Sequence, residues 1–182
     1  MRELSLHILD IVQNSIKAEA DLVQIIIKED IRENILQIKI KDNGKGMEIN
    51  EARRSIDPFV TGRKTREVGL GLSFFSRVAE ESGGKMTVNS NPGEGTEVKA
   101  DFVYDHIDRS PLGDICQTLI TIIALNPEID IKYCHLKEDK EFCFSTEDFR
   151  KELADIKLNE NSVLKWIKEY IENGLNKLYG GE

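Results

Sequence analysis

Hydrophobic residues recur every three or four positions near the start of the chain. This spacing predicts a helix over residues 5–18 with one buried face. The apolar positions are Leu4, Ile8, Ile11, Val12 and Ile16. A polar stripe with the same spacing follows a second face, and it consists of His7, Asp10, Asn14 and Lys17. Side chains three and four positions apart are neighbours on a helix, so the polar groups can meet.

Alternating β-branched runs predict strands in the rest of the first hundred residues. The predicted strands are 23–28, 35–41, 85–90 and 96–104, with helices at 50–56 and 69–82 between them. The pattern after residue 104 predicts a small αββαα unit. Its helices are 110–125, 146–154 and 162–178, and its hairpin joins strands 129–135 and 141–145. We therefore expect two units, residues 1–104 and 105–182.

Composition and charge narrow the class of protein. The chain has 182 residues, of which 40% are hydrophobic and 32% charged, as in an ordinary globular protein. Its net charge of -8 would repel the phosphates of nucleic acids and anionic lipids. No apolar run approaches the roughly 18 residues that span a bilayer, and residues 1–4 resemble a helix more than a signal peptide. We expect a cytoplasmic protein that binds neither nucleic acid nor membrane.

Three cysteines, Cys116, Cys134 and Cys143, form an odd and sparse set without the spacing of a zinc site. We expect them to be reduced. Cys134 and Cys143 are equidistant from the turn at 137–140, so on adjacent strands they would face one another. A redox pair or a soft-metal site there is an alternative to buried free thiols.

The glycines give the strongest functional signal because they let a backbone approach a ligand closely. Neither common phosphate loop is present: there is no GxxxxGK[ST], and both GxG pairs lack the third glycine of the dinucleotide fingerprint. Each glycine pair alone is typical of a simple turn. Their order along the chain is more specific. It runs Asp10-x-x-x-Asn14, Asp42-x-Gly44-x-Gly46, Pro58-Phe59, Gly69-x-Gly71 and Gly93-x-Gly95-Thr96.

This order resembles the gyrase, chaperone, histidine kinase and MutL (GHKL) ATPase superfamily over residues 1–104. Five segments look like its conserved boxes, and they are 14–17, 42–47, 57–61, 69–72 and 93–96. The resemblance implies a Bergerat-type α/β sandwich, an α+β fold in which a mixed sheet carries helices on one face. It also implies that ATP and Mg²⁺ are bound.

The resemblance also assigns nucleotide-binding residues. Asp42 would accept a hydrogen bond from the adenine amino group and Thr96 would support that contact, although Asp-Asn-Gly is also a turn signal by itself. The remaining expected contacts are Asn14, Lys17, Gly44, Gly46, Met47, Phe59, Thr61, Lys64, Gly69, Leu70, Gly71 and Leu72. Asn14 is the expected magnesium ligand, since Mg²⁺ favours hard oxygen donors. Basic residues near the predicted lid at 62–67 form a phosphate-binding set, and they are Arg53, Arg54, Arg63, Lys64 and Arg66.

Asp10 occupies the position where similar hydrolases carry a glutamate that activates the attacking nucleophile. Aspartate supplies the same carboxylate on a side chain one methylene shorter, so we expect Asp10 to be the catalytic base. His7 could tune Asp10 by a hydrogen bond, but a core or surface histidine is the simpler interpretation.

The family resemblance leaves two functions open. The chain starts within a dozen residues of the first box, so a preceding phosphoacceptor helix is not expected and phosphate must go to water or to another protein. We expect a protein kinase acting in trans or a slow ATPase in signal transduction, whose acidic segment 105–182 recruits an unidentified protein partner or phosphoacceptor. The alternative is a non-catalytic, nucleotide-gated interaction protein resembling an anti-sigma factor.

Overall fold

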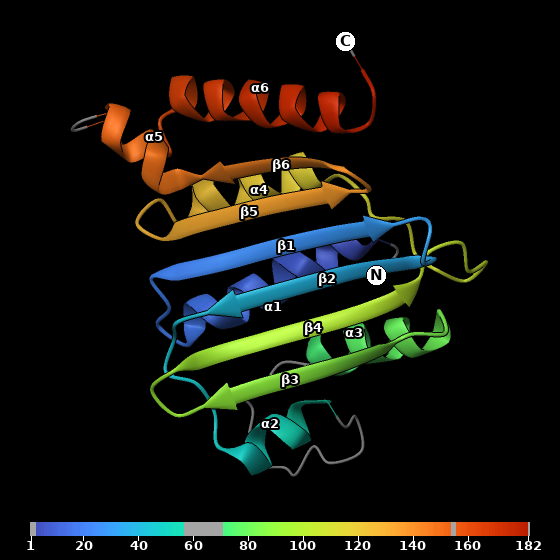
Figure 1. Cartoon of the computed structure of the whole chain (residues 1–182). Coiled ribbons are helices and arrows are strands. Elements are labelled where there is room, and N and C mark those ends of the chain that lie inside the picture. Colours follow the sequence, from blue (N-terminus) through green and yellow to red (C-terminus); the bar gives the residue numbers. More distant parts are fainter. Residues whose placement is uncertain (1–2, 57–70, 154–155, 182) are drawn as a thin grey trace.

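The computed structural model describes residues 3–56, 71–153 and 156–181 (Figure 1). Its strands form one six-stranded sheet in the order β3-β4-β2-β1-β5-β6. The strands are β1 (Leu22–Asp30), β2 (Ile35–Asp42), β3 (Lys85–Asn91), β4 (Gly95–Val103), β5 (Asp130–Lys137) and β6 (Lys140–Ser145). The helices are α1 (Leu4–Lys17), α2 (Ile49–Ile56), α3 (Gly71–Glu81), α4 (Ile115–Leu125), α5 (Thr146–Leu153) and α6 (Asn161–Leu178).

The sheet is mixed, as the sequence predicts, and the α+β fold class is confirmed. Neighbouring strands are antiparallel except β1 and β5, which pair in parallel with Ile25 opposite Tyr133. Helices α1, α3 and α4 lie together behind the sheet in Figure 1. The boundary predicted near residue 104 falls at the end of β4, but β5 and β6 continue the same sheet beyond it.

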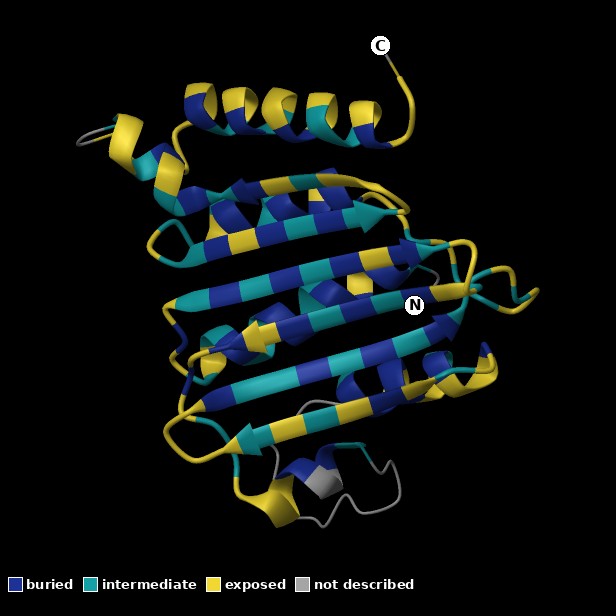
Figure 2. Cartoon of the chain, in the orientation of Figure 1, coloured by how far each residue is buried: buried dark blue, intermediate teal, exposed yellow. Residues whose placement is uncertain are grey.

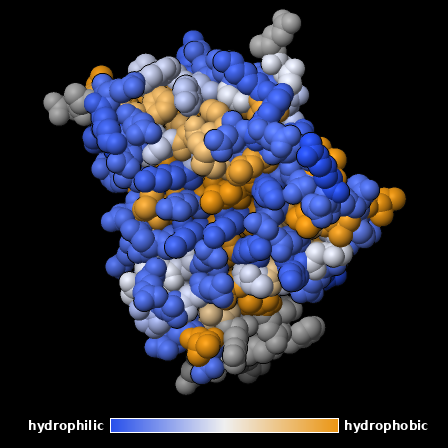
Figure 3. All heavy atoms as spheres, in the orientation of Figure 1, coloured by the Kyte–Doolittle hydropathy of each residue, from blue (hydrophilic) through white to orange (hydrophobic). Residues whose placement is uncertain are grey.

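Buried residues alternate with more exposed ones along the strands (Figure 2). The buried strand residues form one cluster with apolar residues of α1, α3 and α4, so the hydrophobic core lies on the helix side of the sheet. Val23, Ile25 and Ile27 of β1 are buried, and so are alternate residues of β2 and β4. The opposite face is the one seen in Figure 3, where hydrophilic atoms cover most of the surface. Among the described residues, no helix has both the length and the apolar character needed to cross a bilayer.

The start of α4 differs from the prediction. The sequence predicts a helix from Ser110-Pro111, but α4 begins at Ile115, where the Asp114 carboxylate accepts a hydrogen bond from Gln117 N at 2.8 Å. The carbonyls of Pro111 and Leu112 instead accept hydrogen bonds from the first amides of α1, at 2.9 and 2.8 Å. Residues 111 and 112 thus satisfy helix-terminal donors that would otherwise lack partners.

The expectation that all cysteines are reduced is wrong for one pair. Cys134 and Cys143 face each other across β5 and β6, as their spacing predicts, but they form a disulfide with a Cα–Cα distance of 4.2 Å. Cys116 is a buried free thiol. Burial raises the pKa of Cys116 to about 11, so this thiol is protonated and unreactive at neutral pH.

A buried carboxylate joins the sheet to the end of α6. Glu29 accepts hydrogen bonds from His135 Nε2 at 2.8 Å, from the Tyr104 hydroxyl at 3.0 Å and from the Tyr179 hydroxyl. Burial alone would raise the pKa of Glu29, but these hydrogen bonds outweigh it and lower the pKa to about 2. Tyr179 directly follows α6, so the ionised carboxylate holds this helix end against β1 and β5.

We expect Glu29 to stabilise the folded protein at pH values above the pKa that this carboxyl has in the unfolded chain. This stabilisation should be lost in acid. The folded pKa is about 2 against an ordinary 4.5, so stability present above pH 4.5 is lost as the pH falls towards 2. The shift corresponds to about 3 kcal/mol. We would measure the free energy of unfolding in urea at a series of pH values. Glu29→Gln should be less stable than wild type at pH 7, and its free energy of unfolding should fall less steeply as the pH is lowered. Glu33→Gln, at an exposed position, is the matched control; an equally steep Glu29→Gln profile would contradict this account.

The disulfide predicts a simple thiol count. A thiol reagent added to the unreduced protein in denaturant should modify one cysteine per chain, Cys116. The same titration after reduction should modify three, the number in the sequence. Three reactive thiols before reduction would show that Cys134 and Cys143 are not joined in the isolated protein.

Candidate functional site

The site is built around the Asp42 carboxylate at the end of β2. Asp42 is 7% exposed, and one of its oxygens, Oδ1, accepts hydrogen bonds from Gly44 N at 2.9 Å and Thr96 N at 3.1 Å. The other oxygen, Oδ2, accepts a hydrogen bond from Ser15 Oγ at 2.6 Å. The donors come from α1, from the loop after β2 and from β4. This carboxylate is therefore fixed by three separate parts of the chain.

The loop after β2 is fixed on both sides. Lys45 N donates to Ala18 O at 2.8 Å, and Lys45 O accepts a hydrogen bond from Gly93 N at 2.8 Å. Met47 N donates to Ser90 Oγ at 2.8 Å. These hydrogen bonds join the loop to the end of α1 and to the β3–β4 hairpin. They fix the conformation of the loop backbone beside the pocket.

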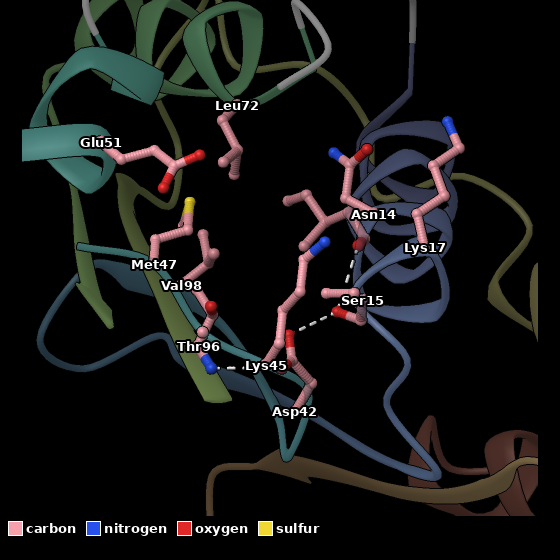
Figure 4. Close-up of a pocket in the computed structure, with 13 residues that line it drawn as sticks. Asn14, Ser15, Lys17, Asp42, Lys45, Met47, Glu51, Leu72, Thr96 and Val98 are labelled. Atoms are coloured by element: carbon pink, nitrogen blue, oxygen red, sulfur yellow. Dashed lines mark hydrogen bonds between the residues drawn. The ribbon is translucent and has the colours of Figure 1, made fainter. Parts of the chain in front are cut away.

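A pocket of about 470 Å³ opens between α1 and the strands (Figure 4). Asp42 and Thr96 lie at one end, and Asn14 projects from α1 into the opposite end. Ile11, Met47, Leu72 and Val98 supply the apolar part of the lining. A mostly apolar cavity with a buried carboxylate at one end suits a flat heterocycle that carries a hydrogen-bond donor.

Most of the described residues that the sequence predicts for the site are brought together. Those lining the pocket are Asn14, Lys17, Asp42, Gly46, Met47, Leu72 and Thr96. Gly44 is buried beside them and donates its amide to Asp42. Phe59, Thr61, Lys64, Gly69 and Leu70 lie outside the described residues, as do the lid at 62–67 and the side chains of Arg53 and Arg54.

Asp10 does not line the pocket but lies one helical turn before Asn14. A Cβ on Gly71, the first residue of α3, would come within 3.4 Å of Asp10 Oδ2, so the carboxylate faces the start of α3. His7 makes no hydrogen bond to Asp10: its ring nitrogens have no hydrogen-bond partner among the described residues, and the ring stacks on Phe75 with the ring centroids 5.3 Å apart. Burial lowers the pKa of His7. His7 is therefore a neutral core residue, in agreement with the simpler of the two interpretations.

Several lining residues were not predicted from the sequence. They are Ile11, Ser15, Ala18, Lys45, Glu51 and Val98. Ser15 and Asp42 are separated by 27 positions, so no local pattern could indicate their hydrogen bond. Glu51 belongs to α2, whose polar residues give no sign that one of them faces a cavity.

Within residues 3–56, 71–153 and 156–181, no three histidine, cysteine or carboxylate side chains form a group that could hold a metal ion. The side chain of Asn14, which lines the pocket, carries an amide oxygen, a hard ligand of the kind that magnesium takes together with phosphate and water.

The comparison with known families agrees with this geometry. Residues 2–105 match the family described as histidine kinase-, DNA gyrase B-, and HSP90-like ATPase. The chain belongs to this family. The resemblance that the ordered glycine and polar motifs indicate is thus confirmed, and residues 2–105 form a histidine kinase-like ATP-binding domain.

Curated relatives in this ATPase family are much longer proteins. A putative sensor protein from Shewanella frigidimarina (strain NCIMB 400) is 32% identical over 109 residues, which cover 59% of this chain and 17% of the relative. Sporulation kinase A from Bacillus subtilis (strain 168) is 32% identical over 96 residues, which cover 52% of this chain and 15% of the kinase. The chain therefore spans less than a fifth of either relative.

A solved structure supports the fold over a larger part of the chain. The N-terminal domain of a DNA repair protein superposes with a TM-score of 0.54 at 16% identity, covering 79% of this chain and 52% of that one. At this identity the likeness concerns the fold alone.

We expect Gly46→Ala to destabilise the protein more than Gly93→Ala. Both glycines have a positive φ, +67° and +79°, so alanine at either costs roughly 1–2 kcal/mol of backbone strain. A Cβ on Gly46 would also lie 2.0 Å from the backbone oxygen of Asn91, whereas one on Gly93 meets nothing within 4 Å. Urea unfolding should therefore show the larger loss for Gly46→Ala, and equal losses would contradict the close packing of this loop.

Proposed function

We propose that the chain binds Mg-ATP in this pocket and directs its γ-phosphate to another protein or to water. It would act as a protein kinase in trans or as a slow ATPase. The observation that carries the proposal is the state of the Asp42 carboxylate, which is buried, fixed and not fully used by the protein.

The unused acceptor capacity of Asp42 suits adenine. A carboxylate has about four acceptor positions, and the three donors that the described part of the chain supplies leave one on Oδ2. The exocyclic amino group of adenine is a donor and can occupy that position. Guanine carries a carbonyl oxygen at the same place on the ring, so its lone pairs would face the carboxylate and the contact would be repulsive. The site therefore favours an adenine nucleotide.

The other end of the pocket suits phosphates and magnesium. Asn14 and Lys17 both line it from α1, and Lys17 is the last residue of that helix. The Asn14 amide oxygen can hold Mg²⁺, and the Lys17 ammonium can neutralise phosphate charge. Mg²⁺ bound with the nucleotide would polarise the phosphoryl oxygens.

Asp10 is suited to orient the attacking group. Its carboxylate lies one turn before Asn14 on the same helix face and close to the start of α3. A water molecule or a protein hydroxyl placed there could give its proton to Asp10 as it attacks the γ-phosphate.

We further propose that residues 105–182 recruit the acceptor or another protein partner. This segment carries 16 of the 33 acidic residues and 10 of the 25 basic ones, so its surface would favour a basic partner. The cytoplasmic location also stays a prediction, based on the distribution of apolar residues along the sequence.

Replacing Asp10 tests the catalytic part of the proposal. Asp10→Asn keeps the shape of the side chain but cannot accept a proton, so ATP affinity should stay within about twofold and turnover should fall by about 10²–10⁴-fold. Phosphate release and protein labelling are followed with γ-labelled ATP, with and without cell extract. Asp139→Asn, whose side chain is 86% exposed, is the matched control and should match wild type.

The results of these assays distinguish phosphoryl transfer from a nucleotide-gated interaction protein. Unchanged turnover in Asp10→Asn would remove Asp10 from the mechanism. A wild type that binds ATP but neither releases phosphate nor labels a protein would contradict phosphoryl transfer and favour a nucleotide-gated interaction protein.

A further inference from the structure

A second carboxylate, Glu51, faces the pocket from α2. Figure 4 shows its side chain beside Met47 and Leu72, on the wall opposite α1. Among the described residues, the Glu51 carboxylate makes no hydrogen bond or ion pair. Asp42 and Glu51 are the two carboxylates that line the pocket within the described part of the chain, and of these only Asp42 is used by protein donors.

The chemistry of ATP limits what Glu51 can contact. An ionised carboxylate accepts hydrogen bonds and donates none. ATP offers donors at two places, the adenine amino group and the ribose hydroxyls, and its remaining polar atoms are acceptors. Asp42 lies at the far end of the pocket and takes the amino group in the proposed function. The ribose hydroxyls are then the donors left for Glu51.

The arrangement of charge supports the same assignment. A triphosphate near Glu51 would be repelled by its carboxylate. Asn14 and Lys17, the groups suited to magnesium and phosphate, lie on α1 across the pocket from Glu51. A nucleotide held by Asp42 at one end and by α1 at its phosphates would keep the triphosphate away from α2, and its sugar would lie between Asp42 and the phosphates.

We propose that Glu51 accepts hydrogen bonds from the ribose hydroxyls and makes the site selective for ribonucleotides over deoxynucleotides. This inference rests on the proposed function. It assigns to α2 a specificity-determining side chain that neither the glycine motifs nor the predicted contacts include.

The experiment compares the affinities of ATP, 2′-deoxyATP and 3′-deoxyATP by calorimetry in the presence of Mg²⁺. Wild type should bind at least one deoxynucleotide about ten- to a hundredfold more weakly than ATP, the effect of losing one hydrogen bond to a charged acceptor. Glu51→Ala should bind all three within about twofold of one another. Glu51→Gln keeps a neutral acceptor and should discriminate less than wild type but more than Glu51→Ala.

Glu48→Ala is the matched control, because Glu48 is an exposed carboxylate three residues earlier that does not line the pocket. It removes the same charge and should keep wild-type discrimination. Urea unfolding of each variant confirms that a loss of discrimination does not come from a loss of folding.

Each contrary result has a distinct meaning. Equal affinities of wild type for the three nucleotides, or full discrimination by Glu51→Ala, would overturn the role of Glu51 while leaving ATP binding intact. A Glu51→Ala variant that loses the Mg²⁺ dependence of binding would assign Glu51 to the metal and also overturn the proposal. If wild type binds none of the nucleotides, the proposed function itself fails, and this inference fails with it.

Discussion

The buried carboxylate of Asp42 needs donors that no single segment of the chain can supply. Removing a charged group from water is unfavourable unless hydrogen bonds replace the lost solvation. Ser15, Gly44 and Thr96 provide them from α1, from the loop after β2 and from β4. These three segments must therefore come together for the charge to be tolerated, and their meeting creates the pocket. The described residues leave one acceptor position of Asp42 unused, so the same constraint that orders the site would also limit what it can bind.

The strands beyond residue 104 support the site indirectly. β5 pairs with β1 and so covers a strand that would otherwise be the edge of a four-stranded sheet. The carbonyls of Pro111 and Leu112 cap the start of α1, the helix that carries Asp10 and Asn14. The ionised Glu29 then fixes the end of α6 against the same sheet. The segment after residue 104 thus helps to hold α1, the helix that carries Asp10 and Asn14, in place.

Much of this structure could be predicted from periodicity and motif order. The helix at the start of the chain, the strand pairs and the order of elements after residue 104 all follow from apolar spacing, because burial of one face dictates that spacing. The start of α4 could not be predicted, since Pro111 and Leu112 satisfy the amides of a helix more than a hundred residues away. Ser15 and Glu51 were missed for a similar reason: their roles depend on which elements face each other. The cysteine spacing predicted that Cys134 and Cys143 would face each other, whereas the expected reduced state rested on the odd number and low density of the cysteines.

In the proposed function, the open acceptor of Asp42 holds the adenine amino group of Mg-ATP. Calorimetric titration of ATP into wild type and Asp42→Asn, each with and without Mg²⁺, tests it most directly. The asparagine variant keeps the shape of the side chain but must turn an amide donor either to Ser15 or to its other protein partners. We expect saturable wild-type binding that Mg²⁺ strengthens, and at least a hundredfold loss in the variant, about 3 kcal/mol. Equal binding by the two proteins, or none by wild type, would contradict the account.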